Sequence, residues 1–215
     1  MQQHGNDRGG RRQALGALLL AGMAAGGAAG AASRAAAAPA GGDSGVDELL
    51  ARTAIQEVLM AYARGNDRND VALIRSCFWP ESTHRHGGFS GKSYDFVNVA
   101  GGIIARLKHC AHFITNVSIR VSGPRAFSEC YYFAHHRRDA ANGGGEEDAF
   151  FEGRYLDFHE QRDGVWKIIR RRGLSDLTVV TPAATPYASW PEGQHSLHDR
   201  NDDYYRMLAE FERGA

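Results

Sequence analysis

One acidic side chain lies where a helix should stop. Residues 62–70 read YARGNDRND, and Asp67 follows directly after an apolar helical stripe. A carboxylate in this place either ends a helix at the surface or points into a cavity. In a cavity the carboxylate could orient a general base and stabilise the positive charge that forms on that base. The second interpretation requires a partner side chain.

Histidines are the other residues that could do chemistry, and they raise the question of a metal. They are paired in the segments 84–86, 109–112 and 135–136. Strand alternation puts His84 and His86 on one face, a spacing that can hold zinc. No acidic or cysteine ligand sits at a recognised metal-motif spacing, so we expect no metal. His135 and His136 point to opposite faces of a strand, so at most one reaches an interior.

The elements that must position these side chains begin with helices. The apolar spacing predicts a helix that opens near Ser44 and ends near residues 65–66, carried by Ile55, Val58, Leu59 and Tyr62. A short helix is expected over residues 69–77, and Trp79-Pro80 ends it. A short strand over residues 81–86 and a third helix over residues 93–108 follow.

Beyond residue 108 the apolar period changes to two, which indicates strands. One long strand carries Phe113, Val117, Ile119 and Val121 on one parity, and further strands are expected over residues 126–136, 150–161 and 165–176. Gly123-Pro124 and Asp163-Gly164 are turns. A loop over residues 181–193 and a last helix over residues 202–213 close the chain. Helices followed by hairpin-linked strands predict an α+β fold, a curved antiparallel sheet with helices on one face. The interior of such a cone suits a small hydrophobic molecule.

Composition limits the partners and the compartment. Lys plus Arg equals Asp plus Glu at 25 each, which argues against nucleic acid. The three cysteines are expected to be core residues, with a disulfide as the alternative. Residues 1–40 read as an export signal of the twin-arginine type, so we expect a periplasmic or secreted domain over residues 46–215. The glycines in its apolar stretch make a stable membrane anchor the weaker alternative.

Several short motifs, taken in order, resemble the SnoaL-like branch of the nuclear transport factor 2-like (cystatin-like) superfamily across residues 49–181. They are AIQE at 54–57, YARGNDR at 62–68, HG at 86–87, HFITN at 112–116, GRYLD at 153–157 and RDGVWKI at 162–168. Members such as the hexachlorocyclohexane dehydrochlorinases and scytalone dehydratases are lyases that use an Asp–His dyad and no cofactor or metal. The resemblance therefore implies a cone-shaped sheet that encloses a cavity.

The resemblance also supplies the missing partner of Asp67. The dyad aspartate of the family falls on Asp67, and the histidine of its His-x-x-Thr-Asn pattern falls on His112. A neutral imidazole, with an unperturbed pKa of about 6.5, can accept a proton near neutral pH. The dehydrochlorinase arginine falls on Arg171, which would steady a leaving group or else be a solvated member of the run 170–172. Those enzymes have lysine where this chain has Tyr62, which argues against chloride elimination. Tyr62 is then either a donor to a substrate oxygen or a core aromatic.

The remaining expectations concern substrate and assembly. Four aromatic residues suit an aromatic or polycyclic substrate, with His86 beside them: Phe89, Phe113, Tyr131 and Trp190. The function expected is a cofactor-independent lyase that eliminates water or breaks a carbon–carbon bond. An isomerase or cyclase, or a small-molecule binding module, are the alternatives, since fold alone does not separate them. Relatives form dimers or trimers, so a homo-oligomer is expected, with Tyr155, Phe158, Trp166 and Ile168 at its interface.

The export signal yields a first prediction. Changing Arg11 and Arg12 together to lysine should leave the precursor in the cytoplasm, because twin-arginine transport reads that pair. Cell fractionation and blotting measure this, with replacement of Arg8 by lysine as the control. Mature protein of the double variant in the periplasm would contradict the twin-arginine interpretation.

Overall fold

The computed structural model describes residues 42–191 and 193–214. The expected export signal over residues 1–40 lies outside them. Within the described part, no helix is both long and apolar enough to cross a membrane.

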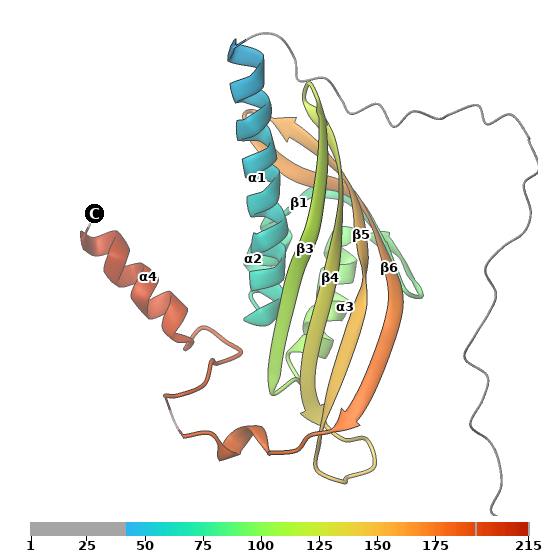
Figure 1. The fold of residues 1–215 in the computed structure, drawn as a ribbon, viewed down its shortest axis with the longest axis vertical. Coiled ribbons are helices and arrows are strands. Elements are labelled where there is room, and N and C mark those ends of the chain that lie inside the picture. The colour runs from blue at the N-terminus through green and yellow to red at the C-terminus, as the bar shows by residue number, and fades with distance from the viewer. Residues whose placement is uncertain (1–41, 192, 215) are drawn as a thin grey trace, which may run out of the picture. The chain divides into compact units, whose positions relative to one another are not determined.

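Two helices open the described chain, and six strands follow, with a third helix between the second and third strands (Figure 1). The elements are α1 (Gly42–Asp67), α2 (Val71–Ser76), β1 (Phe78–His86), β2 (Phe89–Lys92), α3 (Ser93–Ile104), β3 (His109–Ser122), β4 (Arg125–Asp139), β5 (Glu146–Arg162), β6 (Val165–Pro182), a single 3-10 turn (Tyr187–Ser189) and α4 (Asp203–Gly214). The strands form one curved sheet in the order β2-β1-β6-β5-β4-β3. The expected α+β fold is confirmed.

The sheet differs from the expected one in two respects. It is mixed rather than antiparallel, because β1 pairs parallel to β6 while the other neighbours are antiparallel. Helix α3 and the long hairpins from β3 to β6 carry the chain across the sheet before β6 returns beside β1. Strand β2, with only four residues, was not predicted. Strand β1 begins at Phe78, before Pro80, which was expected to end the preceding helix. Pro80 lies within the strand and is exposed.

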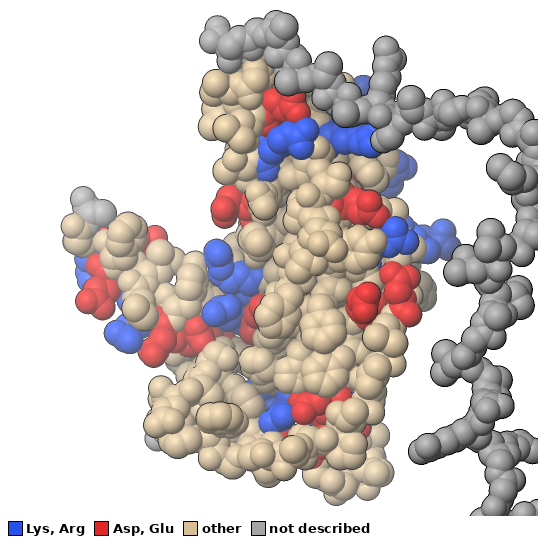
Figure 2. All heavy atoms as spheres, viewed as in Figure 1, with Lys and Arg blue, Asp and Glu red and all other residues tan. Residues whose placement is uncertain are grey.

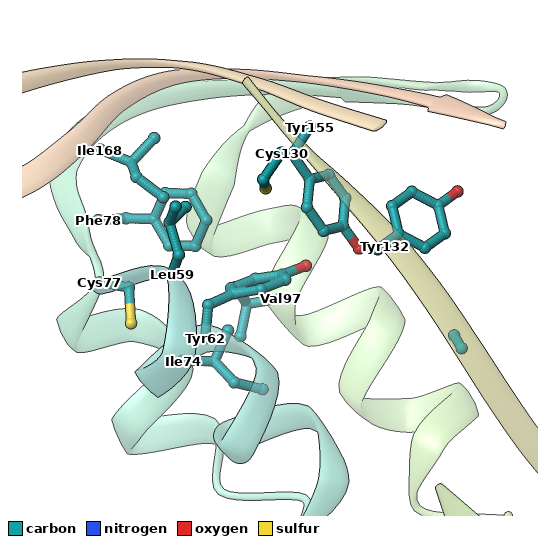
Figure 3. Packing of buried hydrophobic residues seen from close by; sticks show 11 residues of the cluster. Leu59, Tyr62, Ile74, Cys77, Phe78, Val97, Cys130, Tyr132, Tyr155 and Ile168 are labelled. Carbon is teal, nitrogen blue, oxygen red and sulfur yellow. The ribbon is translucent and has the colours of Figure 1, made fainter. Parts of the chain in front are cut away.

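The main core lies between the helices and the inner face of the sheet, the face turned toward α1 (Figure 3). Leu59 and Tyr62 of α1 are buried there with Phe78 of β1 and Ile168 of β6. Burying such a side chain stabilises the fold by about 1.5–3 kcal/mol. A second cluster joins α1 to the far end of the sheet and consists of Ile55, Ile119, Ala126 and Trp166. The three cysteines are free and buried, as expected for core residues.

A β-bulge in β3 decides which side chains face the core. The pairing of β3 with β4 shifts by one residue between Thr115 and Ser118, and Asn116 takes a positive φ of 50°. One inserted residue reverses the alternation of faces. Phe113 and Ile119 therefore lie on opposite faces, although both have odd numbers: Ile119 is 7% exposed and Phe113 56%. The expectation of one apolar parity along this strand is wrong for that reason.

The outer face of the long strands carries exposed apolar side chains. They include Phe113, Tyr131, Phe133, Phe158, Leu177 and Val179, and Figure 2 shows a broad uncharged area over β3 and β4. Of the expected interface residues only Phe158 lies here. Tyr155, Trp166 and Ile168 are buried on the inner face. Tyr155 has the opposite parity to Phe158 along β5, and the extra residue in β6 between Ile168 and Arg170 leaves Trp166 and Ile168 pointing inward.

We expect this outer face to be covered by a second copy of the chain, because contiguous apolar patches on soluble proteins mark interaction sites. Replacing Phe133 with lysine should shift the assembly toward a single subunit, measured by light scattering at micromolar concentration. Replacing Val99, which is exposed on α3, with lysine is the control. A parent protein that scatters as one subunit would defeat this expectation.

Candidate active site

Asp67 and His112 meet where α1 ends beside β3 (Figure 1). The Nδ1 atom of His112 lies 2.8 Å from Oδ1 of Asp67. The imidazole is 9% exposed and the carboxylate 19%, so the pair is largely shielded but reaches solvent. With Nδ1 facing a carboxylate, the ring proton belongs on Nδ1, and Nε2 is left to accept another proton.

Asp67 is free for this contact because another residue caps the following helix. Asp70 is the N-cap of α2, and its Oδ1 accepts a hydrogen bond from the backbone N–H of Leu73 at 3.1 Å. Asn69 takes a positive φ of 49°, which asparagine tolerates, and so turns the chain between α1 and α2. The helix-capping role considered for Asp67 therefore belongs to Asp70.

A second histidine stands beside the dyad on the neighbouring strand. His136 of β4 is paired in register with Cys110, two residues before His112. The rings of His136 and His112 are 5.5 Å apart. Burial, together with the nearby His112, lowers the pKa of His136 to about 3. His136 is therefore neutral near pH 7, and it is the member of the pair 135–136 that reaches the interior.

His86, expected beside the substrate, also faces the interior near the dyad. Burial, and then the charge of Arg171, lowers its pKa to about 4, so it too is neutral near pH 7. A side chain at Gly173 would collide with its ring, since a Cβ there would lie 2.6 Å away. Ser175 Oγ lies 3.5 Å from His86 Nε2 and 3.3 Å from the hydroxyl of Tyr132. Glycine inside a strand marks such close approaches. A Cβ at Gly153 would lie 2.7 Å from the Tyr132 hydroxyl, so this glycine could have identified Tyr132.

Arg171 is not a solvated member of its arginine run. It is 1% exposed and forms two hydrogen bonds with Asp157, of 2.8 and 2.6 Å. Its guanidinium lies between the rings of Tyr62 and Tyr155, 4.1 and 4.2 Å from their centroids. Burial opposes its charge, but the charge and hydrogen bonds of Asp157 outweigh this and hold its pKa above the usual value.

Tyr62 belongs to the same buried cluster. It is 4% exposed and makes edge contacts with Phe78 and Tyr155, with ring centroids 5.7 and 5.8 Å apart. Burial raises the pKa of its hydroxyl. Of the two roles considered for Tyr62, the structure therefore places it as a core aromatic. Arg171 and Tyr62 pack together in the core beside the dyad, and the Nη1 atom of Arg171 has no hydrogen-bond partner among the described residues. A contact of either residue with a leaving group stays a prediction.

The expected aromatic substrate contacts are scattered. Phe89 is half-buried against Phe96, with ring centroids 5.4 Å apart, and Phe96 stacks on His86. Phe113 and Tyr131 lie on the outer face, opposite His112, because neighbours along a strand point to opposite faces. They cannot share a ligand with the dyad, so this part of the prediction is wrong.

The C-terminal segment lies next to the end of α1. Trp190 is 55% exposed and lines a surface cavity of about 910 Å³ with Arg68, which follows Asp67. The two ring nitrogens of His198 lie 2.7 and 2.9 Å from the carbonyl oxygens of Asp67 and Ile104. This segment is therefore attached to the residue that carries the dyad carboxylate.

Among the described residues, one group of side chains could hold a metal ion. Ligand atoms of Cys110, His112 and His136 lie within 4.8 Å of one another. His84 and His86, the pair considered from the sequence, stack with their rings 6.1 Å apart. The two rings lie nearly parallel, with 8° between their planes, so their nitrogens do not converge on a common point.

The buried ion pair yields a prediction on stability. Replacing Asp157 with alanine should cost about 3–5 kcal/mol of unfolding free energy, because Arg171 is left charged and unpaired in the core. The double replacement of Asp157 by leucine and Arg171 by methionine should cost less than that single change. Urea denaturation measures both. Replacing the exposed Arg170 with methionine is the control and should change stability by about 0.5 kcal/mol or less. An equal loss of unfolding free energy for the alanine variant at Asp157 and the methionine variant at Arg170 would contradict this prediction.

Comparisons with known proteins agree with this fold. A solved type 2 hexachlorocyclohexane dehydrochlorinase, LinA, superposes with a TM-score of 0.58 at 20% identity over 69% of this chain and 98% of its own. A putative scytalone dehydratase from Novosphingobium aromaticivorans gives 0.55 at 23% identity over 67% and 97%. At these identities the likeness shows the shared fold. Among curated proteins none has a matching sequence. The model of the SnoaL-like domain matches residues 47–172, and the chain therefore belongs to the SnoaL-like family of the nuclear transport factor 2-like superfamily.

Proposed function

We propose that the protein is a cofactor-independent lyase that acts through Asp67 and His112. The observation that carries this proposal is the 2.8 Å contact between His112 Nδ1 and Asp67 Oδ1 in a largely shielded place. A dehydrochlorinase and a putative dehydratase share the fold, which supports elimination as the reaction class.

In the proposed reaction, Nε2 of His112 takes a proton from a carbon or hydroxyl of the substrate. The carboxylate of Asp67 accepts the hydrogen bond from Nδ1 and balances the positive charge that forms on the ring. The electrons left behind push out a hydroxyl or another small group, and a hydroxyl takes the proton back from the His112 imidazolium and departs as water. In the retro-aldol alternative a carbon–carbon bond breaks and the carbanion fragment takes that proton. Because His136 and His86 are neutral, neither of them opposes the charge on His112.

The neighbouring groups favour water or another oxygen-based leaving group. The hydroxyls of Tyr132 and Ser175 and the neutral imidazole of His86 lie close together on the inner face. These groups donate and accept hydrogen bonds, whereas chloride would call for a fixed positive charge. The charge of Arg171 is already balanced by Asp157 and shared with two tyrosine rings, although its Nη1 atom has no hydrogen-bond partner among the described residues. A small hydroxylated aromatic or polycyclic compound is the proposed substrate.

The dyad itself gives the decisive prediction. Replacing Asp67 with asparagine keeps the shape of the side chain, but removes its charge and can favour the wrong tautomer of His112. Turnover should fall by several orders of magnitude. The equivalent change in the Ser-His-Asp triad lowers turnover about 10⁴-fold. Replacing His112 with alanine should abolish turnover while substrate still binds. The double variant should be hardly worse than the histidine variant, because the two residues act as a unit.

Steady-state kinetics and calorimetric binding measure these effects, and melting temperatures close to that of the parent exclude unfolding as the cause. Replacing Asp95, an exposed acidic residue in the first turn of α3, with asparagine is the matched control. A fully active Asp67→Asn variant would contradict the proposed mechanism, and only the fold assignment would stand.

The reaction class is tested by incubating the protein with hydroxylated aromatics and steroids, followed by mass spectrometry. Loss of the mass of one water supports the dehydratase. An unchanged mass with a new retention time indicates an isomerase or cyclase instead. Ligand binding without any product indicates a binding module.

A further inference from the structure

We propose that Cys110, His112 and His136 form a binding site for a soft divalent cation such as Zn²⁺, and that the bound ion switches off the dyad. The three side chains offer one thiol and two imidazoles within 4.8 Å of one another. This is the nitrogen and sulfur donor set that zinc prefers.

The strands hold these donors in place before any ion arrives. Cys110 and His112 are two residues apart on β3, so they share the inner face. His136 is the direct partner of Cys110 on β4, and directly opposed residues have Cβ atoms about 4.5–5.5 Å apart. Because backbone hydrogen bonds fix all three positions, binding needs only small side-chain movements.

The distances match a tetrahedral ion. Zinc lies about 2.3 Å from sulfur and about 2.0–2.1 Å from nitrogen, which puts a sulfur and a nitrogen ligand roughly 3.5 Å apart at the tetrahedral angle. The Sγ atom of Cys110 lies 3.6 Å from Nδ1 of His112. That separation suits two ligands of one ion, whereas the contact is weak as a hydrogen bond.

Two further observations point to a ligand at this place. The Nε2 atom of His136 is buried and has no hydrogen-bond partner among the described residues, which is uncommon for a buried polar atom. The Oδ1 atom of Asp67 lies 2.8 Å from His112 Nδ1 and can serve as a fourth ligand if the pair opens by roughly half an ångström. The partial exposure of Asp67 and His112 gives the ion an entry path.

Binding at Nδ1 is incompatible with the proposed catalysis, and this part of the inference rests on the proposed function. The dyad needs the ring proton on Nδ1 and a free lone pair on Nε2. An ion on Nδ1 moves that proton to Nε2, so Nε2 can no longer accept one. Cys110 meanwhile releases its thiol proton to solvent, and one proton leaves per ion bound. Affinity should therefore rise about tenfold per pH unit while the thiol is protonated.

Titration of the purified full chain with CoCl₂ tests the site without any substrate. We expect one Co²⁺ per chain, with thiolate-to-cobalt charge-transfer absorption in the near ultraviolet, and its displacement by ZnCl₂. Replacing Cys110 with alanine should remove this absorption. The matched control is Cys77→Ala, since Cys77 is also a buried free thiol but lies outside the cluster. Absence of the band from folded parent protein, or its survival in Cys110→Ala, would overturn the site.

Turnover measurements then test the switch. ZnCl₂ should inhibit the parent, and Cys110→Ala should stay active while needing at least tenfold more zinc for the same inhibition. Equal inhibition of both proteins would overturn the switch. If no substrate is turned over by any form, the proposed lyase fails, while the cobalt spectra still decide the metal site.

Discussion

The buried ion pair between Arg171 and Asp157 fixes how α1 lies on the sheet. The guanidinium is held by a carboxylate of β5 and enclosed by Tyr62 of α1 and Tyr155 of β5. A charged pair in such a place must be fully matched, because a displaced partner leaves an uncompensated charge in the core. Asn66, one turn after Tyr62, donates a hydrogen bond to its carbonyl oxygen at 2.8 Å. The end of α1, and with it the carboxylate of Asp67, is therefore positioned by a contact that the dyad does not touch.

A second constraint is the register of the strands. The bulge of β3 keeps His112 and Ile119 on the same face despite their opposite parity. The register of β5 with β6 shifts between Phe158 and His159, so Arg171 joins Ile168 on the inner face while Arg170 points out. Each inserted residue turns one segment of the strand over. Polar side chains such as His112 and Arg171 and apolar core side chains thus occupy successive stretches of the inner face of the sheet.

These shifts explain what the sequence could and could not predict. Helices, long strands and tight turns follow from local periodicity and turn residues, and the family motifs correctly brought Asp67 to His112. Periodicity assumes unbroken alternation, so it misplaced Phe113 on the bulged β3 and left Arg171 undecided. Alternation is unbroken along β4, and Tyr131 was misplaced because the odd-numbered aromatic residues of that strand lie on its outer face. The parallel pairing of β1 with β6 depends on contacts far apart in the chain, which no local pattern encodes. Gly153 and Gly173 were the available signals, because side chains there would collide with Tyr132 and His86.

The same imidazole can serve a proton or a metal ion, and its tautomer decides which. Asp67 favours the proton on Nδ1 of His112. An ion bound to Nδ1 would find two further ligands in Cys110 and His136. Burial, and the negative charge of Asp67, raise the pKa of the Cys110 thiol, so without a metal the cysteine stays protonated and leaves the dyad intact. Only a cation that binds thiolate strongly enough to displace that proton can take Nδ1 from Asp67. Hard ions such as Mg²⁺, which prefer oxygen ligands, lack that ability, so the geometry separates soft from hard cations by the cost of ionising one thiol.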